Sequence, residues 1–160
     1  MSNGYTRAMP ESDQPIKPPA RLRALASWQA SRVSTLGARL TAQRMPLAAR
    51  SDFAVLAALE EYGPLSQADL GRRLGLDRND VNGIVNRLQD GGRIDRRADP
   101  DDRRRNMVTL SSEGRAYLEE IQEHADAVQD ELLTGLDASE RRDLRLLLEK
   151  LLNGHSPQPS

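Results

Sequence analysis

The chain has 160 residues, a formal net charge of −1 at pH 7 and no cysteine. This length is sufficient for one domain with a hydrophobic core, and the lack of cysteine excludes disulfides, thiolate metal sites and cysteine nucleophiles. The charge is uneven: residues 66–110 carry 10 basic and 8 acidic side chains, whereas residues 111–160 carry 5 basic and 11 acidic ones. Such polarity can orient a protein on a polyanion, so the net charge does not exclude nucleic acid.

Catalytic and metal-binding patterns are weak. The two histidines, His124 and His155, are far apart in the sequence, which argues against a metal site or a histidine-based catalytic centre. Glu119 and Glu120 are adjacent carboxylates without a base, nucleophile or metal ligand nearby, so we expect neither an enzyme nor a cofactor. No apolar run approaches a membrane span and the N-terminus lacks a secretory pattern, which predicts a cytoplasmic protein.

Two helices are expected in the first part of the chain. The first 19 residues contain four prolines among polar residues, which predicts a disordered arm. A helix is expected from Ala20 to Gln43, before Pro46, and a second from about Arg50 to Tyr62. In the first helix Leu22, Leu25, Val33, Leu36 and Leu40 can line one side. In the second helix Phe53, Leu56 and Leu59 are expected to face inward.

A helix-turn-helix pattern follows. Ser66 precedes an acid by three residues and can cap a short helix that runs to about Leu74. Leu65 and Leu70 are placed to form a hydrophobic staple at its start. Residues 75 and 76 leave only a tight turn before the next helix, which is the spacing of a helix-turn-helix.

The second helix of this motif begins after Asp77, which can cap it, and ends before Gly92, which suits a left-handed conformation. Apolar residues at i, i+3, i+4 and i+7 form an inward stripe of Val81, Ile84, Val85 and Leu88. The opposite side carries residue types that reach phosphates and base edges, namely Arg78, Asn79, Asn82, Asn86 and Arg87. This pattern predicts a recognition helix.

The next segments predict a wing. Arg93–Arg97 and Asn106–Leu110 have strand character and flank a charged, turn-rich loop, which is typical of a hairpin. On a strand, Arg96 and Arg97 alternate faces, so one can approach DNA phosphates and the other solvent. Acids of the loop can hold some of its arginines extended toward a minor groove; these residues are Asp99, Asp101 and Asp102, and Arg103, Arg104 and Arg105.

Two further helices are expected after the wing. Ser111 can cap a long helix to about Leu133, and Asp137 to Glu140 form a capping box that opens a final helix. This last helix carries a wide apolar face of Leu144, Leu146, Leu147, Leu148, Leu151 and Leu152. The small winged domain cannot cover such a face, so we interpret it, together with the first helix, as a dimer interface.

The run from Leu65 to Gly114, with Asp-Pro-Asp-Asp-Arg-Arg at 99–104 and Val-Thr-Leu-Ser-Ser-Glu-Gly at 108–114, resembles the MarR family of bacterial winged-helix transcription regulators. The resemblance covers about residues 20–153 and implies a mainly α fold with a small β-wing, in which N- and C-terminal helices dimerise. It also implies an obligate homodimer on a pseudo-palindromic operator, and often release by a small ligand. By position, Asp102 and Arg104 match the wing-tip acid and arginine of the family. Arg93 stands where the family usually has an apolar residue, which can change the angle of the hairpin.

The resemblance favours DNA contacts over ordinary surface roles. Asn82 and Asn86 can pair bidentately with adenine, whereas arginine suits phosphate or guanine; the alternative is that both asparagines are merely solvated and the arginine run is a soluble loop. Gly83 costs a helix about 1 kcal/mol relative to alanine, which a close approach to DNA would offset; the alternative is drift. The candidate DNA-binding residues are Arg78, Asn79, Asn82, Asn86, Arg87, Arg97, Asp102, Arg103, Arg104 and Arg105.

A ligand pocket is a further expectation, because pockets for aromatic or phenolic acids in the family lie between the dimerisation helices and the winged domain. An indole beside a guanidinium can stack on an aromatic carboxylate and neutralise it, although such a tryptophan is more often core or interface. Arg50 and Asp52 are interpreted as capping or dipole residues. Ala54 stands where the urate-responsive subgroup has an acid, which argues against a urate response. The candidate pocket residues are Trp28, Arg32, Phe53 and Tyr117.

The sequence therefore predicts a homodimeric, sequence-specific DNA-binding regulator, most simply a repressor, with double-stranded DNA as its partner and no membrane association. The alternative is a winged helix for protein–protein assembly, which would lack salt-sensitive DNA affinity. The expected organisation is a disordered arm (1–19), an N-terminal dimerisation helix and connection (20–49), a winged helix-turn-helix DNA-binding domain (50–114), C-terminal dimerisation helices (115–153) and a tail (154–160).

Overall fold

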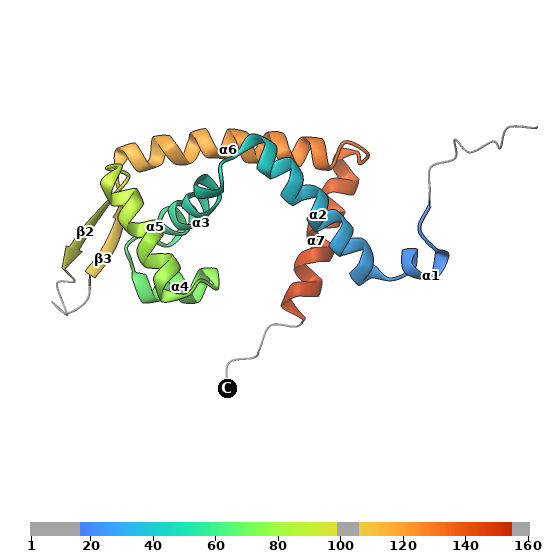
Figure 1. The fold of residues 1–160 in the computed structure, drawn as a ribbon, viewed down its shortest axis with the longest axis horizontal. Coiled ribbons are helices and arrows are strands. Elements are labelled where there is room, and N and C mark those ends of the chain that lie inside the picture. Colours follow the sequence, from blue (N-terminus) through green and yellow to red (C-terminus); the bar gives the residue numbers. More distant parts are fainter. Residues whose placement is uncertain (1–16, 99–105, 155–160) are drawn as a thin grey trace, which may run out of the picture. The chain divides into compact units, whose positions relative to one another are not determined.

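The computed structural model describes residues 17–98 and 106–154 (Figure 1). The expectations for the arm before residue 17, for the wing tip with Asp102 to Arg105, and for the tail after residue 154 lie outside the described residues. The elements are α1 (Ala20–Arg23), α2 (Ala26–Arg44), α3 (Leu47–Tyr62), β1 (Leu65–Ser66), α4 (Gln67–Leu74), α5 (Arg78–Asp90), β2 (Ile94–Ala98), β3 (Asn106–Leu110), α6 (Ser112–Leu132) and α7 (Ala138–Asn153). This mainly helical fold with a small antiparallel sheet confirms the predicted fold class.

The chain divides into two compact units, residues 1–35 and residues 36–160. In the first unit, the helix expected from residue 20 is interrupted, because α1 ends at Arg23 and α2 begins at Ala26. The side chain of Gln29 donates to the Arg23 carbonyl at 2.6 Å, which gives this carbonyl a polar partner at the break. Within the described ranges, no helix is both long and apolar enough to cross a membrane.

The second unit is built around one hydrophobic core. α3, α4, α5, α6 and the sheet contribute fully buried side chains, and Figure 1 shows α6 passing beside α3 and the base of the hairpin. Burial of one such large apolar side chain contributes about 1.5–3 kcal/mol. The predicted inward stripe of α5 is buried throughout, as are Leu56 and Leu59 of α3, whereas Phe53 is half-buried.

Helix boundaries follow the local signals. The hydroxyl oxygen of Ser66 accepts from the Asp69 amide at 3.1 Å, and the carboxylate of Asp77 accepts from the Asp80 amide at 2.8 Å. Between these caps, Gly75 adopts φ 65°, a left-handed conformation that ends α4. A further confirmed cap opens α7, where the box of Asp137 and Glu140 forms in both directions. The helix-turn-helix is therefore specified locally at each end of both helices.

The sheet has one strand more than the sequence indicated. Its order is β1-β3-β2, and both pairings are antiparallel. The predicted hairpin forms with Ile94 opposite Leu110, and β1 adds Leu65 opposite Val108. A strand of two residues has no readable alternation, and its second residue, Ser66, also carries the cap of α4. This short strand joins the start of the helix-turn-helix to the wing.

The start of α6 lies against the start of the hairpin. The Ser111 amide donates to the Arg93 carbonyl at 3.2 Å, and the Ser111 hydroxyl donates to the Gly92 carbonyl at 2.7 Å. A Cβ atom on Gly114 would lie 2.0 Å from the same Arg93 carbonyl oxygen. Only glycine permits this approach of helix to backbone.

We expect Gly114→Ala to lower the free energy of unfolding by about 1–3 kcal/mol, the usual cost of overpacking, because the clashing atom belongs to the backbone. Urea denaturation followed by circular dichroism measures this difference. Gly135→Ala is the matched control, because a Cβ at that position meets nothing within 4 Å. Equal losses in the two variants would contradict a steric requirement at Gly114.

Candidate nucleic-acid interface

The side of α5 opposite the core forms a continuous polar surface. Its members are exposed and recur along one side of the helix, and we call them the polar face of α5: Arg78, Asn79, Asn82, Gly83 and Asn86. The neighbouring carboxylate of Asp77 is occupied as the helix cap. Within the part of the chain that the structure describes, no hydrogen bond or ion pair engages the side chains of Arg78, Asn79 and Asn82. Their donors and acceptors are available to a partner molecule.

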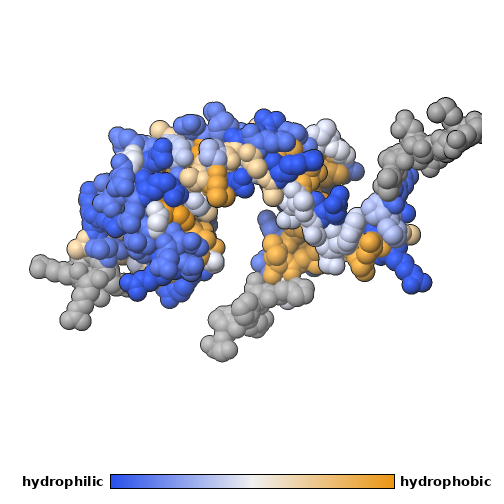
Figure 2. Space-filling model, viewed as in Figure 1, coloured by the Kyte–Doolittle hydropathy of each residue, from blue (hydrophilic) through white to orange (hydrophobic). Residues whose placement is uncertain are grey.

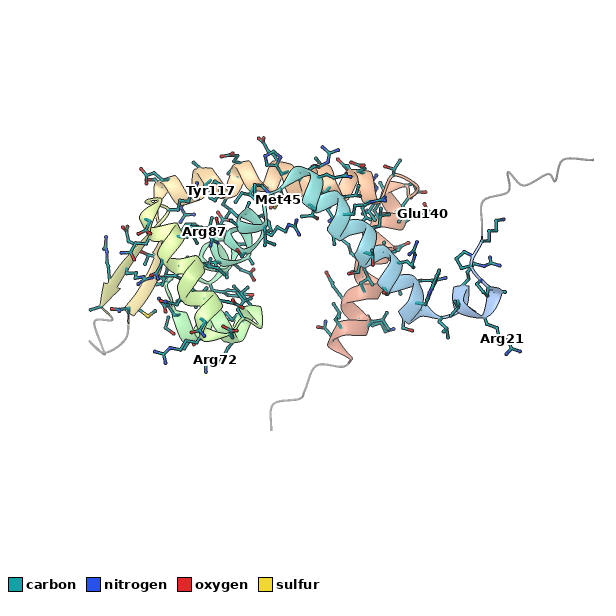
Figure 3. All side chains as sticks on the ribbon, in the orientation of Figure 1. Arg21, Met45, Arg72, Arg87, Tyr117 and Glu140 are labelled. Atoms are coloured by element: carbon teal, nitrogen blue, oxygen red, sulfur yellow. The ribbon has the colours of Figure 1, made fainter. Side chains whose placement is uncertain are left out.

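A groove of about 590 Å³ lies beside the N-terminal end of this face. It is lined by Ser66, Gln67, Ala68, Gly71, Arg72, Leu76, Arg78, Val81 and Asn106. Arg72, labelled in Figure 3, is paired with Asp69 of the same helix. Arg78 therefore supplies to the groove a cation that has no carboxylate partner among residues 17–98 and 106–154. None of the four expected ligand-pocket residues lines it.

Arg87 does not lie with the polar face, although it was predicted to contact DNA. Its guanidinium donates to Asp52 Oδ1 at 2.5 Å and to the Ser51 hydroxyl at 3.1 Å, so it is directed toward α3. The Arg87 side chain is 40% exposed, whereas that of Asp52 is 2% exposed. The geometry favours an anchoring role, in which Arg87 fixes the C-terminal half of α5 to α3.

Asp52 does not cap α3, so that interpretation is wrong. The N-cap position of α3 is Pro46, and Asp52 is buried farther along the helix. Its carboxylate accepts from the Tyr117 hydroxyl at 3.4 Å and lies 3.9 Å from Arg93. The Arg93 guanidinium stacks over the Tyr117 ring, 3.4 Å from its centroid. One buried carboxylate thus links α3, α5, α6 and the residue preceding β2.

The environment of Tyr117, labelled with Arg87 in Figure 3, keeps its phenol protonated. Burial raises the pKa of Tyr117, and the negative charge of Asp52 raises it further against the opposing effect of Arg93. A protonated phenol can donate to the Asp52 carboxylate, which agrees with the observed contact. The sequence held one signal for this cluster, because Asp52 shares the inward side of α3 with Ala49, Leu56 and Leu59.

Of the four expected pocket residues, Trp28 and Arg32 belong to the first unit, and Phe53 and Tyr117 belong to the second. Arg32 lies over the Trp28 ring, 5.9 Å from its centroid. Phe53 and Tyr117 both pack against the apolar clusters of the second unit. The described residues contain no group of three or more side chains that could hold a metal ion.

The two arginines of β2 differ as strand alternation predicts. Arg97 is exposed, whereas Arg96 is partly buried on the side of the strand that carries Ile94. The Arg96 guanidinium donates to the amide oxygen of Asn86 on α5. The base of the wing is thereby joined to the polar face of α5.

We expect Asp52 and Arg87 to be energetically coupled by about 1–2 kcal/mol, the range of a charge-assisted hydrogen bond reduced for the partial exposure of Arg87. A double-mutant cycle with Asp52→Asn and Arg87→Met, followed by urea denaturation, measures this coupling. The exposed pair of Arg44 and Glu131, at 2.6 Å, is the matched control and should couple by less than about 1 kcal/mol. Strict additivity of Asp52→Asn and Arg87→Met would contradict the anchoring role.

Comparisons with known proteins agree with this geometry. A sequence model described as MarR family matches residues 48–105. The chain is 34% identical over 101 residues to the transcriptional repressor NicR of Pseudomonas putida, and the alignment covers 63% of the chain and 64% of NicR. The chain thus spans slightly less than two thirds of the length of this relative.

Two solved structures are similar over most of their length. A probable transcriptional regulator from Pseudomonas aeruginosa has a TM-score of 0.68 and 35% identity, over 82% of the chain and 99% of that structure. Bordetella bronchiseptica BpsR, whose DNA binding is regulated by 6-hydroxynicotinic acid, has a TM-score of 0.67 and 29% identity, over 78% of the chain and 96% of that structure. The chain belongs to the MarR family of winged helix-turn-helix transcriptional regulators.

Proposed function

We propose that the chain is a sequence-specific DNA-binding repressor that binds a pseudo-palindromic operator as a homodimer, with α5 in the major groove. The observation that carries this proposal is the polar face of α5, which exposes arginine and asparagine side chains. The opposite side of the same helix is buried in the hydrophobic core. Asparagine and arginine are the side chains that read adenine and guanine edges. The repressor function named for NicR supports the same reading.

The local electrostatics favour a polyanion at this face. Several acids near α5 are already neutralised or used as caps: Asp77 at the start of α5, Asp69 with Arg72, and Asp52 with Arg87. The polar face of α5 itself contains a cation, Arg78, and no carboxylate, so it does not share the acidic content of the surrounding region. We assign Arg78 and the groove beside it to a phosphate, and Arg97 with the wing residues Asp102 to Arg105 to the flanking backbone and minor groove.

The proposed dimer rests on α7. Three leucines of this helix, Leu146, Leu147 and Leu148, are 58%, 60% and 45% exposed. Figure 2 shows hydrophobic residues at the surface along the C-terminal half of α7, in contrast to the hydrophilic surface around α4 and α5. A contiguous exposed apolar surface marks an interaction site. A second copy of the chain is the proposed occupant, because two recognition helices about one DNA turn apart match a palindromic operator.

The proposed repressor also responds to a small aromatic or phenolic acid. BpsR provides the motivation, since 6-hydroxynicotinic acid regulates its DNA binding. In this chain Trp28 and Arg32 offer a ring and a cation at 5.9 Å, which suits a flat carboxylate. Phe53 and Tyr117 remain the other proposed lining residues.

We expect selection from a random duplex library to enrich an inverted repeat whose half-sites lie about 34–36 Å apart. Leu147→Glu should place a charge in the proposed dimer interface, giving a monomer in sedimentation analysis and loss of the repeat. Leu47→Glu is the control, because Leu47 is a 78% exposed leucine at the start of α3. A dimeric Leu147→Glu protein would contradict the assigned interface.

The same selection separates the repressor from an assembly module. Folded, dimeric wild-type protein that enriches no sequence and binds DNA without salt dependence would contradict the proposed function, because phosphate contacts release counterions.

We expect 6-hydroxynicotinic acid, used as a probe, to quench the fluorescence of Trp28, the single tryptophan, and to release operator DNA. Arg32→Ala should raise the dissociation constant of the probe, measured from this quenching, about fivefold, because loss of the stacked cation costs about 1 kcal/mol. Arg21→Ala is the control, since Arg21 is an exposed arginine of α1. Equal effects of the two variants would contradict a role for the Trp28–Arg32 pair.

A further inference from the structure

Asn86 differs from the other asparagines of the polar face because its amide has a fixed partner. The Arg96 guanidinium donates to the Asn86 amide oxygen. A guanidinium carries only donors, so the oxygen of this amide, and not its nitrogen, must face Arg96. The orientation of the Asn86 amide therefore follows from chemistry, and its NH₂ group is directed away from Arg96.

Arg96 is itself held in place. It is partly buried, it pairs in the sheet opposite Val108, and its Nε atom is enclosed without a hydrogen-bond partner among the described residues. A side chain confined in this way has few alternative rotamers. It brings a positive charge to the junction between the wing and α5, next to Asn86.

This pairing changes the base edge that Asn86 can recognise. Bidentate recognition of adenine uses the asparagine oxygen as acceptor for the N6 amino group and the asparagine nitrogen as donor to N7. At Asn86, an adenine amino group would have to donate to the same oxygen that already accepts from the Arg96 guanidinium. Two donor groups, one of them positively charged, would then lie side by side. A guanine edge presents only acceptors, O6 and N7, and suits the amide donors beside that positive charge.

We propose that Arg96 is a specificity-determining residue that orients Asn86 as a hydrogen-bond donor, so that the base pair facing Asn86 is read as G·C rather than A·T. This inference depends on the proposed function, since it assigns one contact of the same recognition helix. It also distinguishes Asn86 from Asn79 and Asn82, whose amides have no such partner among the described residues and can turn to suit adenine.

The test is selection from a random duplex library with wild-type protein and single variants, each checked for folding by circular dichroism. Asn86→Ala identifies the base pair that Asn86 reads, as the position that loses its preference. A lost contact of this kind reduces discrimination by about 5- to 150-fold. Asn82→Ala is the matched control and should affect a different position. We expect the position identified by Asn86→Ala to be G·C in the wild-type selection.

Two substitutions of Arg96 separate orientation from structural support. Arg96→Lys keeps a donor-only cation and should preserve G·C, whereas Arg96→Gln can donate or accept and should shift the preference toward A·T. If Arg96→Gln does not fold, Asn86→Asp serves instead. In this variant one carboxylate oxygen still faces Arg96, and the other presents an acceptor to the base. The preferred base pair should therefore change from G·C to C·G, because the cytosine N4 amino group is a donor whereas the guanine edge offers only acceptors.

The outcomes are distinct. An A·T pair at the Asn86 position, an unchanged G·C preference in Arg96→Gln, or an uninverted pair in Asn86→Asp would overturn the inference while leaving the repressor function intact. No enriched sequence with folded wild-type protein would overturn the proposed function, and the inference with it.

Discussion

The position of the recognition helix depends on one buried carboxylate. Asp52 is almost inaccessible to solvent, and a charge in that environment is tolerated only when it is paired and hydrogen-bonded. Arg87 of α5, Arg93 just before β2 and Tyr117 of α6 meet this requirement. Because loss of any one contact leaves a poorly satisfied charge, α5 is held in one orientation relative to α3 and α6. Apolar packing alone is less directional.

The features of the fold that were predictable are those written in short stretches of sequence. The caps at Ser66, Asp77 and Asp137 were predictable because a side chain bonds its own helix within three residues. The buried stripe of α5 follows from spacing alone. These local signals are sufficient to predict the two helices of the helix-turn-helix. The hairpin is predictable from the two strand-like segments that flank the charged loop.

The features that were missed depend on partners far away in the sequence. Asp52 resembles a surface residue near a helix start until Arg87, 35 residues later, is brought against it. The pairing of Asn86 with Arg96 likewise joins α5 to the wing, and the pairing of β1 with β3 places Leu65 opposite Val108, on the far side of the helix-turn-helix in the sequence. The sequence predicts Arg87 as a DNA contact because helical spacing does not reveal which long side chains bend toward a neighbouring helix, as Arg87 does toward α3. Local patterns therefore predicted the elements better than the chemistry between them.

The recognition helix consequently has two ends with different freedom. Near its start, the side chains of Arg78 and Asn79 have no hydrogen-bond or ion-pair partner in the part of the chain that the structure describes, whereas near its end Asn86 and Arg87 each bind another element. Side chains at the start of α5 can therefore adjust to a partner molecule, whereas Asn86 would meet such a partner with an orientation already set by the protein. Such preorganised groups lose less conformational entropy on binding.

The ties at the end of α5 also limit how this helix can be transferred between relatives. A grafted α5 that retains Arg87 in a host without an acid at the position of Asp52 would leave a partly buried cation unpaired. A grafted α5 that retains Asn86 in a host without Arg96 would have the same sequence, but its Asn86 amide would no longer be oriented by a guanidinium. A chimaera made by exchanging residues 78–90 alone would therefore separate α5 from two of its side-chain partners. In this protein those partners are Asp52 of α3 and Arg96 of β2.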